Sequence, residues 1–377
     1  MEHDLKKYNS PVVIIGAGLA GAVLAERFAG SGAKVLVIEK RDHVGGNCYD
    51  YVDEAGITVQ KYGPHIFHTN NEKVWEYISR FTEWLPYKHV VLARYKGKTY
   101  TLPVNLITIR ELSAKNKAEE ISQKLLNAYG AGVKIQISEL LKSTDKSLTE
   151  LAKKIYEVIY KDYSLKQWGT SLDKLDMKVS ARVPIWTDED NRYFKDKYQG
   201  IPVKGYTQII KNMLNNPNID IILNTDYYNI KEEISCDKLF FSGEVDAFFN
   251  YEHGSLRYRS LKYEIETLNK EYYQDAAVVN YTDKTPFTRI TEFKHFNFLK
   301  SWQTTIMKEY PEEYDPKMNI PSYPFLDSEN NAKYKKYLSM AENNKNVILV
   351  GRLAEFKYYN MDGVIERALE VYENHKL

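Results

Sequence analysis

The chain has 377 residues, 43% of them hydrophobic, which is enough for two or three domains with buried cores. Its 52 basic and 51 acidic residues leave a net charge of +1, which excludes the strongly basic surface typical of proteins that bind nucleic acid. The two isolated cysteines argue against a disulfide framework and a metal site. The sequence has no apolar run long enough for a membrane span, and its polar first segment argues against a signal peptide. We therefore expect a cytoplasmic protein.

The first 40 residues predict a βαβ unit that binds a dinucleotide. Its strand, helix and second strand are expected at residues 12–15, 22–29 and 35–38. Gly16 permits the tight turn after the first strand, Gly18 allows close approach of a pyrophosphate, and Gly21 allows the helix to pack on the strand. Glu39, at the end of the second strand, can accept hydrogen bonds from a ribose. The complete arrangement favours a dinucleotide site over an ordinary glycine-rich turn.

A second signal changes the predicted cofactor from NAD to FAD. A basic residue, Lys40, is followed by Gly45-Gly46-Asn47, which is typical of flavoproteins in which the backbone passes close to the cofactor. His65 follows a Gly-Pro turn and could hydrogen-bond the flavin ring. A purely structural histidine is an equally good interpretation of this spacing. His65 and His68 are too few for a metal site.

The rest of the chain alternates between helical and strand patterns. A helix is expected at 72–82, a hairpin turning at Lys96-Gly97, a helical stretch over 107–163 and a mobile loop over 182–206. Antiparallel strands are expected later, followed by a final strand and helix. The expected strands and helices of this second half lie at 207–214, 219–223, 238–243, 256–264, 276–281, 289–296, 346–352 and from about 362.

These elements predict an α/β fold with three parts. The first is a discontinuous Rossmann-like FAD-binding domain formed by residues 1–85, 200–250 and 335–377. The second is a helical insertion, residues 105–165, with a mobile nucleotide loop that extends to about residue 195. The third is an antiparallel sheet domain for the substrate, formed by residues 86–104 and 251–334.

Several short segments together resemble the bacterial type of the UDP-galactopyranose mutase family over essentially the whole chain. The matching segments are 16–21, 37–41, 45–47, 62–69, 166–169, 198–202, 258–261, 288–289, 308–311 and 351–359. The resemblance implies a pyranose–furanose isomerisation of a nucleotide sugar without net redox change. It implies reduced FAD as the nucleophile at the anomeric carbon, NAD(P)H as the reductant and a homodimer.

The resemblance also implies roles for individual residues. Arg289 matches the diphosphate arginine, Tyr310 and Tyr358 match tyrosines beside the diphosphate, and His65 matches the histidine beside the flavin. These four are the expected catalytic residues. The expected cofactor-binding residues are Gly16, Gly18, Leu19, Gly21, Glu39, Lys40, Gly46, Asn47, His65, Ile66, Arg352, Tyr359 and Met361. The expected substrate-binding residues are Tyr163, Trp168, Tyr193, Tyr198, Arg259, Arg289, Tyr310, Tyr358, Gln60, His89, Trp186 and Asn360.

Four of these positions depart from the family pattern. Trp186 stands where the family has a second arginine on the mobile loop, and Gln60, His89 and Asn360 replace a histidine, an asparagine and an acid. Losing one arginine from a diphosphate site costs roughly 2–5 kcal/mol unless Arg192 or a nearby lysine replaces it. A site with fewer charged side chains near the sugar suits a hexose with fewer hydroxyl groups. We therefore favour dTDP-fucopyranose, converted to dTDP-fucofuranose for surface polysaccharide such as O-antigen, over UDP-galactopyranose.

Three alternatives remain open from the sequence. The departures could be neutral drift in a UDP-galactopyranose mutase. The chain could instead be an oxidoreductase similar to flavin amine oxidases, which share its N-terminal motifs. It could also bind nucleotide sugars without catalysis, because the loop arginine is missing.

Overall fold

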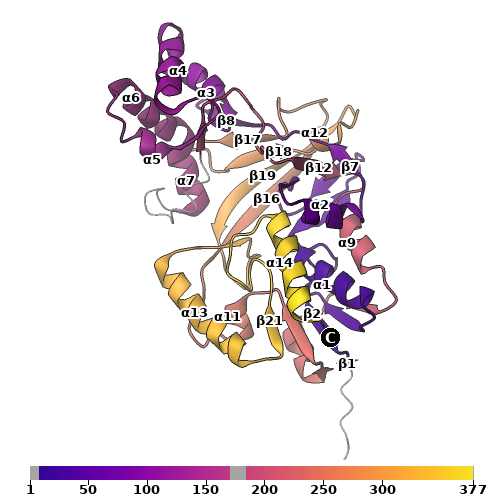
Figure 1. Cartoon of the computed structure of the whole chain (residues 1–377). Coiled ribbons are helices and arrows are strands. Elements are labelled where there is room, and N and C mark those ends of the chain that lie inside the picture. The colour runs from indigo at the N-terminus through magenta and orange to yellow at the C-terminus, as the bar shows by residue number, and fades with distance from the viewer. Residues whose placement is uncertain (1–7, 170–183, 377) are drawn as a thin grey trace, which may run out of the picture.

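A five-stranded parallel sheet forms the nucleotide-binding part of the computed structural model, which describes residues 8–169 and 184–376 (Figure 1). The strand order is β13-β3-β2-β15-β21, and every neighbouring pair is parallel. The strands are β2 (Val12–Ile15), β3 (Val35–Ile38), β13 (Ile219–Ile222), β15 (Lys238–Phe241) and β21 (Val347–Leu349). They come from three distant stretches of the chain, so the discontinuous Rossmann-like fold is confirmed.

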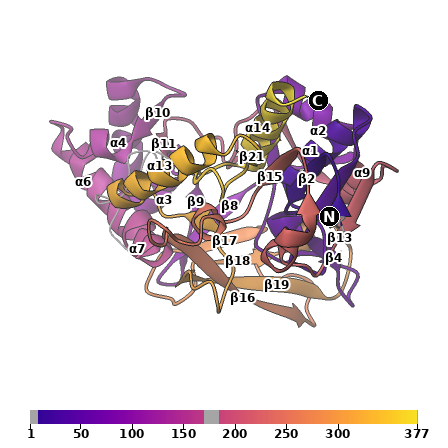
Figure 2. The same cartoon turned by 90° about the horizontal axis from the view of Figure 1, so that it is seen from below.

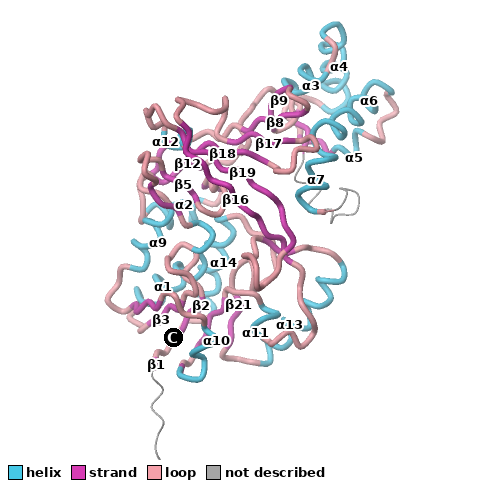
Figure 3. Tube along the Cα trace, turned by 180° about the vertical axis from the view of Figure 1, so that it is seen from behind, coloured by secondary structure: helices cyan, strands magenta, loops and turns pink. Residues whose placement is uncertain are grey.

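Both faces of this sheet are covered by helices, which explains why its strands are continuous apolar runs. Val12 and Ile14 face one core, with helices α1, α9 and α14, whereas Val13 and Ile15 face the other core, with α11 and α13. The helices are α1 (Leu19–Gly30), α9 (Tyr206–Leu214), α11 (Val245–Phe248), α13 (Ser328–Asn343) and α14 (Met361–Asn374). Seen from behind, α1 and α14 lie beside the sheet (Figure 3).

A seven-stranded sheet forms the centre of the molecule, with the order β20-β16-β19-β18-β17-β8-β9. Its members are β8 (Val91–Tyr95), β9 (Lys98–Leu102), β16 (Tyr258–Leu268), β17 (Val278–Tyr281), β18 (Arg289–Glu292), β19 (Thr304–Glu313) and β20 (Tyr323–Pro324). All pairs are antiparallel except β17 with β8, which is parallel. The predicted hairpin 90–102 is confirmed. The predicted strand 289–296 is too long, because α12 (Lys294–Asn297) begins after Glu292.

A helical part lies at one end of this sheet (Figure 2). It contains α3 (Leu106–Leu112), α4 (Lys115–Tyr129), α5 (Ile137–Leu140), α6 (Lys146–Ile155) and α7 (Lys161–Trp168). The predicted helical stretch over 107–163 is interrupted by one short strand, β10 (Lys134–Gln136), which pairs with β11 (Pro184–Trp186). The predicted loop 182–206 is also corrected. Its residues 182–183 lie outside the described chain, and the remainder contains the strands β11 and β12 (Tyr198–Pro202).

Short elements complete the described chain. They are β1 (Tyr8–Asn9), β4 (Asp50–Val52), β5 (Thr58–Gln60), β6 (Phe67–Thr69), α2 (Glu72–Ser79), β7 (Trp84–Pro86), α10 (Tyr227–Ile230) and β14 (Ile234–Ser235). Among the helices of residues 8–169 and 184–376, none is long and apolar enough to cross a membrane.

Candidate active site

A long cleft runs along the carboxyl edge of the parallel sheet, where open α/β folds bind their ligands. Most predicted cofactor residues line it, namely Gly16, Gly18, Leu19, Glu39, Lys40, Gly46, Asn47, His65, Arg352 and Met361. Three predicted residues are not part of its lining. Gly21 lies beneath it, where a Cβ atom would come within 2.0 Å of the Gly16 carbonyl oxygen. Ile66 is buried in the core, and the backbone carbonyl of Tyr359 accepts a hydrogen bond from Arg352 Nη2 (2.7 Å).

Two glycines meet at the phosphate end of this cleft. Gly46 has φ +55°, and a Cβ atom there would lie 2.8 Å from the Gly18 Cα atom. Gly18 is also the N-cap of α1, whose first N–H groups face the cleft edge. A helix N-terminus with a glycine cradle is suited to a pyrophosphate.

The ribose end of the cleft is organised by Glu39. Its Oε2 accepts a hydrogen bond from the Ala17 N–H (2.8 Å) and its Oε1 accepts one from the Arg41 N–H (2.9 Å). The carboxylate is therefore held in one orientation, with remaining lone pairs for hydroxyl groups. Arg41 Nη2 donates to Asn47 Oδ1 (2.9 Å), whereas within the described chain its buried Nη1 makes no hydrogen bond. These residues fit the adenosine diphosphate half of FAD.

His65 lies where the cleft approaches the second sheet. Desolvation, with a smaller effect of Arg352, lowers the pKa of His65 to about 4, so the ring is neutral at pH 7. Its Nδ1 lies 2.8 Å from the Gly63 carbonyl oxygen, which can only accept a hydrogen bond. The proton is therefore on Nδ1, and Nε2 is an acceptor.

Arg289 lies in a row of residues that crosses the central sheet. Strand register places Tyr263, Glu309, Arg289 and Asn280 directly opposite one another on β16, β19, β18 and β17, with their side chains on one face. Arg289 Nη2 donates to the Tyr163 hydroxyl oxygen (2.9 Å), and its Nε lies 3.6 Å from Glu309 Oε2. Among the described residues, Arg289 Nε and Asn280 Oδ1 are buried without a hydrogen bond.

The ionisable groups of this row, the Arg289 guanidinium and the Glu309 carboxyl, affect each other's pKa. Burial alone would lower the pKa of Arg289, but Glu309 and the surrounding tyrosines raise it, so the guanidinium stays charged. Burial raises the pKa of Glu309, and Arg289 opposes that shift. The Arg289 side chain is 28% exposed, whereas that of Glu309 is only 3% exposed. The accessible cation with buried donors is suited to an anion such as a diphosphate.

A second arginine lies nearby on the same face. Arg259 on β16 is 6% exposed and stands directly opposite Tyr323 on β20. Its Nε makes no hydrogen bond within the described chain. Arg289 and Arg259 both act on the pKa of Tyr323, which burial raises, so the Tyr323 hydroxyl is protonated and lies near both cations.

Helix α7 covers this face with side chains that the sequence assigned to the nucleotide. Gln167 Nε2 donates to the Tyr323 hydroxyl oxygen, and the Trp168 ring lies 5.4 Å from the Tyr323 ring. The Tyr358 ring lies 5.9 Å from Tyr323. The structure therefore brings Tyr163, Trp168, Arg259, Arg289 and Tyr358 together around Tyr323.

His89 and Tyr193 lie at the edge of this cluster. His89 is 3% exposed, and burial with the nearby Arg289 lowers its pKa to about 3, so its ring is neutral. The Tyr193 ring lies 5.8 Å from the His89 ring.

Tyr310 is not part of this cluster, which corrects its expected position. Glu309 faces Arg289, so the alternation of a strand directs Tyr310 to the opposite face of β19. There its hydroxyl donates to Glu264 Oε2 (2.8 Å).

Other expected substrate residues lie elsewhere. Tyr198 stacks on Trp75 (5.1 Å) and donates to Glu72 Oε1 (2.6 Å). Gln60 Nε2 donates to the backbone carbonyl of His65 (3.2 Å), so its amide supports the histidine loop. Asn360 is the exposed N-cap residue of α14.

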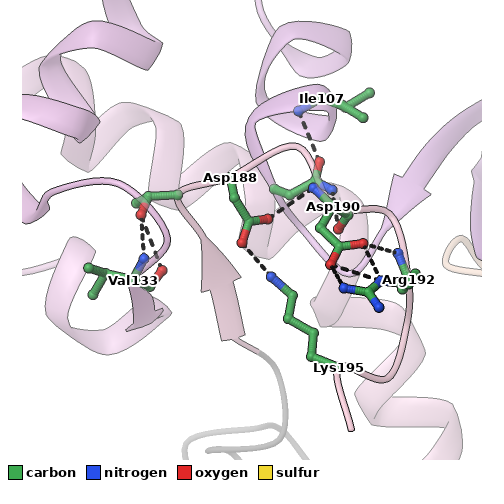
Figure 4. Close-up of polar contacts among 8 residues, drawn as sticks. Ile107, Val133, Asp188, Asp190, Arg192 and Lys195 are labelled. Carbon is green, nitrogen blue, oxygen red and sulfur yellow. Dashed lines mark hydrogen bonds and ion pairs between the residues drawn. The ribbon is translucent and has the colours of Figure 1, made fainter. Parts of the chain in front are cut away.

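Trp186 lies on β11, and two nearby cations, Arg192 and Lys195, are both paired within the described part of the chain (Figure 4). Arg192 Nη2 lies 2.7 Å from Asp190 Oδ2. Lys195 forms an ion pair with Asp188, and its Nζ lies 3.6 Å from the centre of the Trp186 ring. Each cation is therefore held by a neighbouring acid rather than left free for a ligand.

Two residues of the cluster, Glu309 and Tyr323, were not predicted from the sequence. Glu309 stands next to the tyrosine that the resemblance selected, and only the strand register shows which of the two faces Arg289. Tyr323 lies between Ser322 and Pro324 in a two-residue strand without a motif.

Comparisons with known proteins agree with this geometry. A sequence profile described as UDP-galactopyranose mutase matches residues 158–358, and one described as an NAD(P)-binding Rossmann-like domain matches residues 14–81. A probable UDP-galactopyranose mutase of Klebsiella pneumoniae is 38% identical over 96% of this chain and 94% of its own. The dTDP-fucopyranose mutase of Escherichia coli is 36% identical over 95% of this chain and 96% of its own.

Structural comparison supports the fold alone. The crystal structure of a reduced UDP-galactopyranose mutase superposes with a TM-score of 0.70 at 14% identity, over 97% of this chain and 93% of that one. By contrast, the similarity to the L-amino-acid oxidase of Bungarus fasciatus covers only 21% of this chain. The sequence similarity to that oxidase thus covers only a short part of the chain. The fold is nevertheless shared with oxidases such as a putative protoporphyrinogen oxidase from Exiguobacterium, at a TM-score of 0.65 and 12% identity over 98% of this chain and 99% of that one.

Proposed function

Because this chain belongs to the UDP-galactopyranose mutase family, we propose that it interconverts the pyranose and furanose forms of a nucleotide-activated, galacto-configured sugar. The observation that carries this proposal is the arginine pair beside the dinucleotide cleft. Within the described chain, Arg289 and Arg259 both have a buried Nε without a hydrogen bond, and both lie near Tyr323. Two guanidinium groups with open donors are suited to the diphosphate of a nucleotide sugar.

The cleft residues fit FAD, which the glycine pair Gly18 and Gly46, the carboxylate of Glu39 and the free Nη1 of Arg41 would hold. When bound and reduced, FAD supplies the nucleophile for the anomeric carbon. Arg352 connects the cleft to the arginine pair, because its Nη1 donates to the Ser322 carbonyl oxygen (3.1 Å) next to Tyr323. The sugar would therefore lie between the flavin end of the cleft and the diphosphate site.

The residues of this chain stabilise the departing diphosphate and hold it for the return step. Arg289 remains charged and neutralises the phosphate oxygens as the bond to the sugar breaks. Burial raises the pKa of Tyr163 and of Tyr323, so both hydroxyls stay protonated and can donate hydrogen bonds. Glu309 orients Arg289 from the protein side. His65 Nε2, which carries no proton, can accept one hydrogen bond from the cofactor or the sugar.

For the sugar, we propose dTDP-fucopyranose, which is converted to dTDP-fucofuranose. The support is the neutral ring of His89 at the edge of the Tyr323 cluster, together with Gln60, an amide where the family pattern has a histidine, which supports the His65 loop. A site with fewer charged groups suits a hexose that lacks one hydroxyl group. UDP-galactopyranose is the second candidate, because relatives with each name are similarly related, at 38% and 36% identity.

One experiment separates these candidates. The FAD-loaded enzyme is reduced with dithionite and incubated separately with dTDP-fucopyranose and UDP-galactopyranose, and furanose formation is followed by HPLC. Faster turnover of the dTDP sugar supports the proposal, and faster turnover of UDP-galactopyranose overturns the order. The oxidised enzyme serves as the control. Activity that requires oxygen would instead indicate an oxidase, and no turnover of either sugar would favour a non-catalytic binder.

We propose the remaining properties on the same family basis. NAD(P)H is the expected physiological reductant, a homodimer the expected assembly, the cytoplasm the expected location and surface polysaccharide the expected destination of the product. Reduction of the bound flavin by NADPH under anaerobic conditions, followed at its absorbance maximum, tests the first of these.

A further inference from the structure

Helix α7 reaches the active-site sheet through side chains on one face. Tyr163, Lys166 and Gln167 stand at i, i+3 and i+4, so they project in the same direction. Tyr163 accepts a hydrogen bond from Arg289 (2.9 Å), and Gln167 donates to the hydroxyl of Tyr323. The two outer contacts therefore join the nucleotide-binding helix to the diphosphate site, and Lys166 stands between them.

Lys166 binds a loop rather than an acid. Its Nζ donates to three backbone carbonyl oxygens, those of Tyr281 (2.7 Å), Thr285 (2.9 Å) and Phe287 (2.9 Å). An ammonium group has three donors, so all of them are used. The Tyr281 carbonyl ends β17, the other two belong to the loop between β17 and β18, and Phe287 lies two residues before Arg289.

The loop is also fixed from its other side. Asp283 Oδ1 accepts hydrogen bonds from the Thr285 N–H (3.1 Å) and hydroxyl (2.5 Å), and its Oδ2 accepts one from the Lys96 N–H (2.9 Å). The loop thus presents its carbonyls to one point, which only a cation with several donors can satisfy. Without that cation, three carbonyl groups would lose their partner.

We propose that Lys166 is a positioning residue that locks α7 to the β17–β18 loop and thereby sets the distance between the nucleotide-binding side chains and Arg289. This inference rests on the proposed function, because it assigns the α7 face to the nucleotide and Arg289 to the diphosphate. It predicts that loss of the Lys166 ammonium weakens nucleotide binding without direct contact between Lys166 and the ligand. A guanidinium group, which also has several donors, should replace it.

The test measures binding of UDP and dTDP to the FAD-loaded protein by calorimetry at pH 7. Lys166→Met should bind the better of the two nucleotides at least about tenfold more weakly, as expected when hydrogen bonds from a charged group are lost. Lys166→Arg should stay within about threefold of the unmodified protein. Lys161→Met is the matched control, because Lys161 is an exposed lysine of the same helix that pairs only with Glu157.

The pH dependence gives a second measurement on folded, unmodified protein. Burial lowers the pKa of Lys166 to about 8, opposed by Asp283 on the loop and Asp162 on α7. Arg94 on β8 is the further charged group there, and it contacts Tyr281. Nucleotide affinity should fall as the pH rises through about 8, and Lys166→Arg should abolish that fall.

The outcomes are distinct. If the unmodified protein binds neither nucleotide, the proposed function fails. If it binds one and Lys166→Met binds equally well, the positioning role is overturned and the function stands. Should Lys166→Met not fold, Lys166→Gln, which retains two donors, must show an intermediate loss; an unchanged affinity contradicts the inference.

Discussion

Arg289 shows how a single residue can be both accessible and desolvated. Its side chain is 28% exposed, but its Nε is buried without a hydrogen bond within the described chain, and Glu309 lies 3.6 Å away. Such a guanidinium keeps donor capacity that an anionic ligand at its exposed side can use. Glu309 in turn depends on Arg289, because removal of the guanidinium would leave the buried Glu309 carboxyl without this charged partner.

The first prediction concerns this residue. Arg289→Ala should lower turnover by at least about a hundredfold, because loss of a buried charge at a diphosphate costs roughly 2–5 kcal/mol. The bound flavin should be retained, since Arg289 does not line the cofactor cleft. HPLC measures the furanose product, and the visible spectrum measures the flavin content. A near-normal rate in flavin-loaded Arg289→Ala would refute the diphosphate assignment.

The second prediction separates two tyrosines. Tyr323→Phe removes a hydroxyl near Arg259 and Arg289, and should raise KM for the nucleotide sugar about tenfold, the cost of one hydrogen bond to a charged group. Tyr310→Phe removes a hydroxyl that bonds only Glu264 in the described structure, on the opposite face, and should leave KM unchanged. The two variants are a matched pair with the same atom removed. A larger effect in Tyr310→Phe would show that the resemblance had identified the right tyrosine.

These tyrosines also show what sequence alone can tell about a site. The resemblance correctly led to the segment 308–311, but the choice between Glu309 and Tyr310 depends on which residue of β19 stands opposite Arg289. Register comes from pairing with a strand twenty residues away, and a shift of one residue exchanges the two faces. Gln60 and Tyr198 make local hydrogen bonds in directions that spacing does not encode.

At the scale of elements, strands with a strong apolar pattern were predicted well, and strands rich in polar residues were not. β2, β3 and β15 are buried on both faces and read as apolar runs, and the hairpin of β8 and β9 has its turn at Lys96 and Gly97. β19 combines Lys308, Glu309 and Pro311 and carries no such signal, because one face forms the anion site. β11 is three residues long and depends on pairing with β10, which no local pattern reveals.

The third prediction concerns β11. Trp186 carries Lys195 on its ring face at 3.6 Å, so Trp186→Arg would replace a cation–π contact with two like charges. We expect the melting temperature to fall by about 1–3 °C, corresponding to about 1–2 kcal/mol, with the ratio of the two furanose products unchanged. The double variant Trp186→Arg/Lys195→Met should lose less stability than the sum of the single variants, because the repulsion is gone. A shift of preference toward UDP-galactopyranose in Trp186→Arg would show that residue 186 determines the sugar.

The whole molecule is organised by the cofactor cleft, whose walls come from residues around 15–48, 225–244, 320–322 and 351–364. The sequence predicted this discontinuity, because a late strand followed by a glycine had to return to the first βαβ unit. What it could not predict is how the central sheet and α7 approach the cleft, since those contacts involve polar side chains of the residues that bind the ligand. Because segments that are distant in the sequence line one cleft, binding of FAD there should increase the free energy of unfolding of the whole chain.

The last prediction measures that coupling. Removing FAD should lower the melting temperature, because a ligand at a thousand times its Kd stabilises the folded state by about 4 kcal/mol. Gly18→Ala is the matched variant: φ at residue 18 is −76°, and its Cβ would lie 3.6 Å from Gly46 Cα, an ordinary contact. The apo-protein should therefore melt at its usual temperature. The added methyl group would nevertheless occupy the position where the backbone approaches the pyrophosphate, so most of the stabilisation by FAD should be lost. If Gly18→Ala gains as much stability from FAD as the unmodified protein, the cofactor phosphates do not lie against the backbone of Gly18.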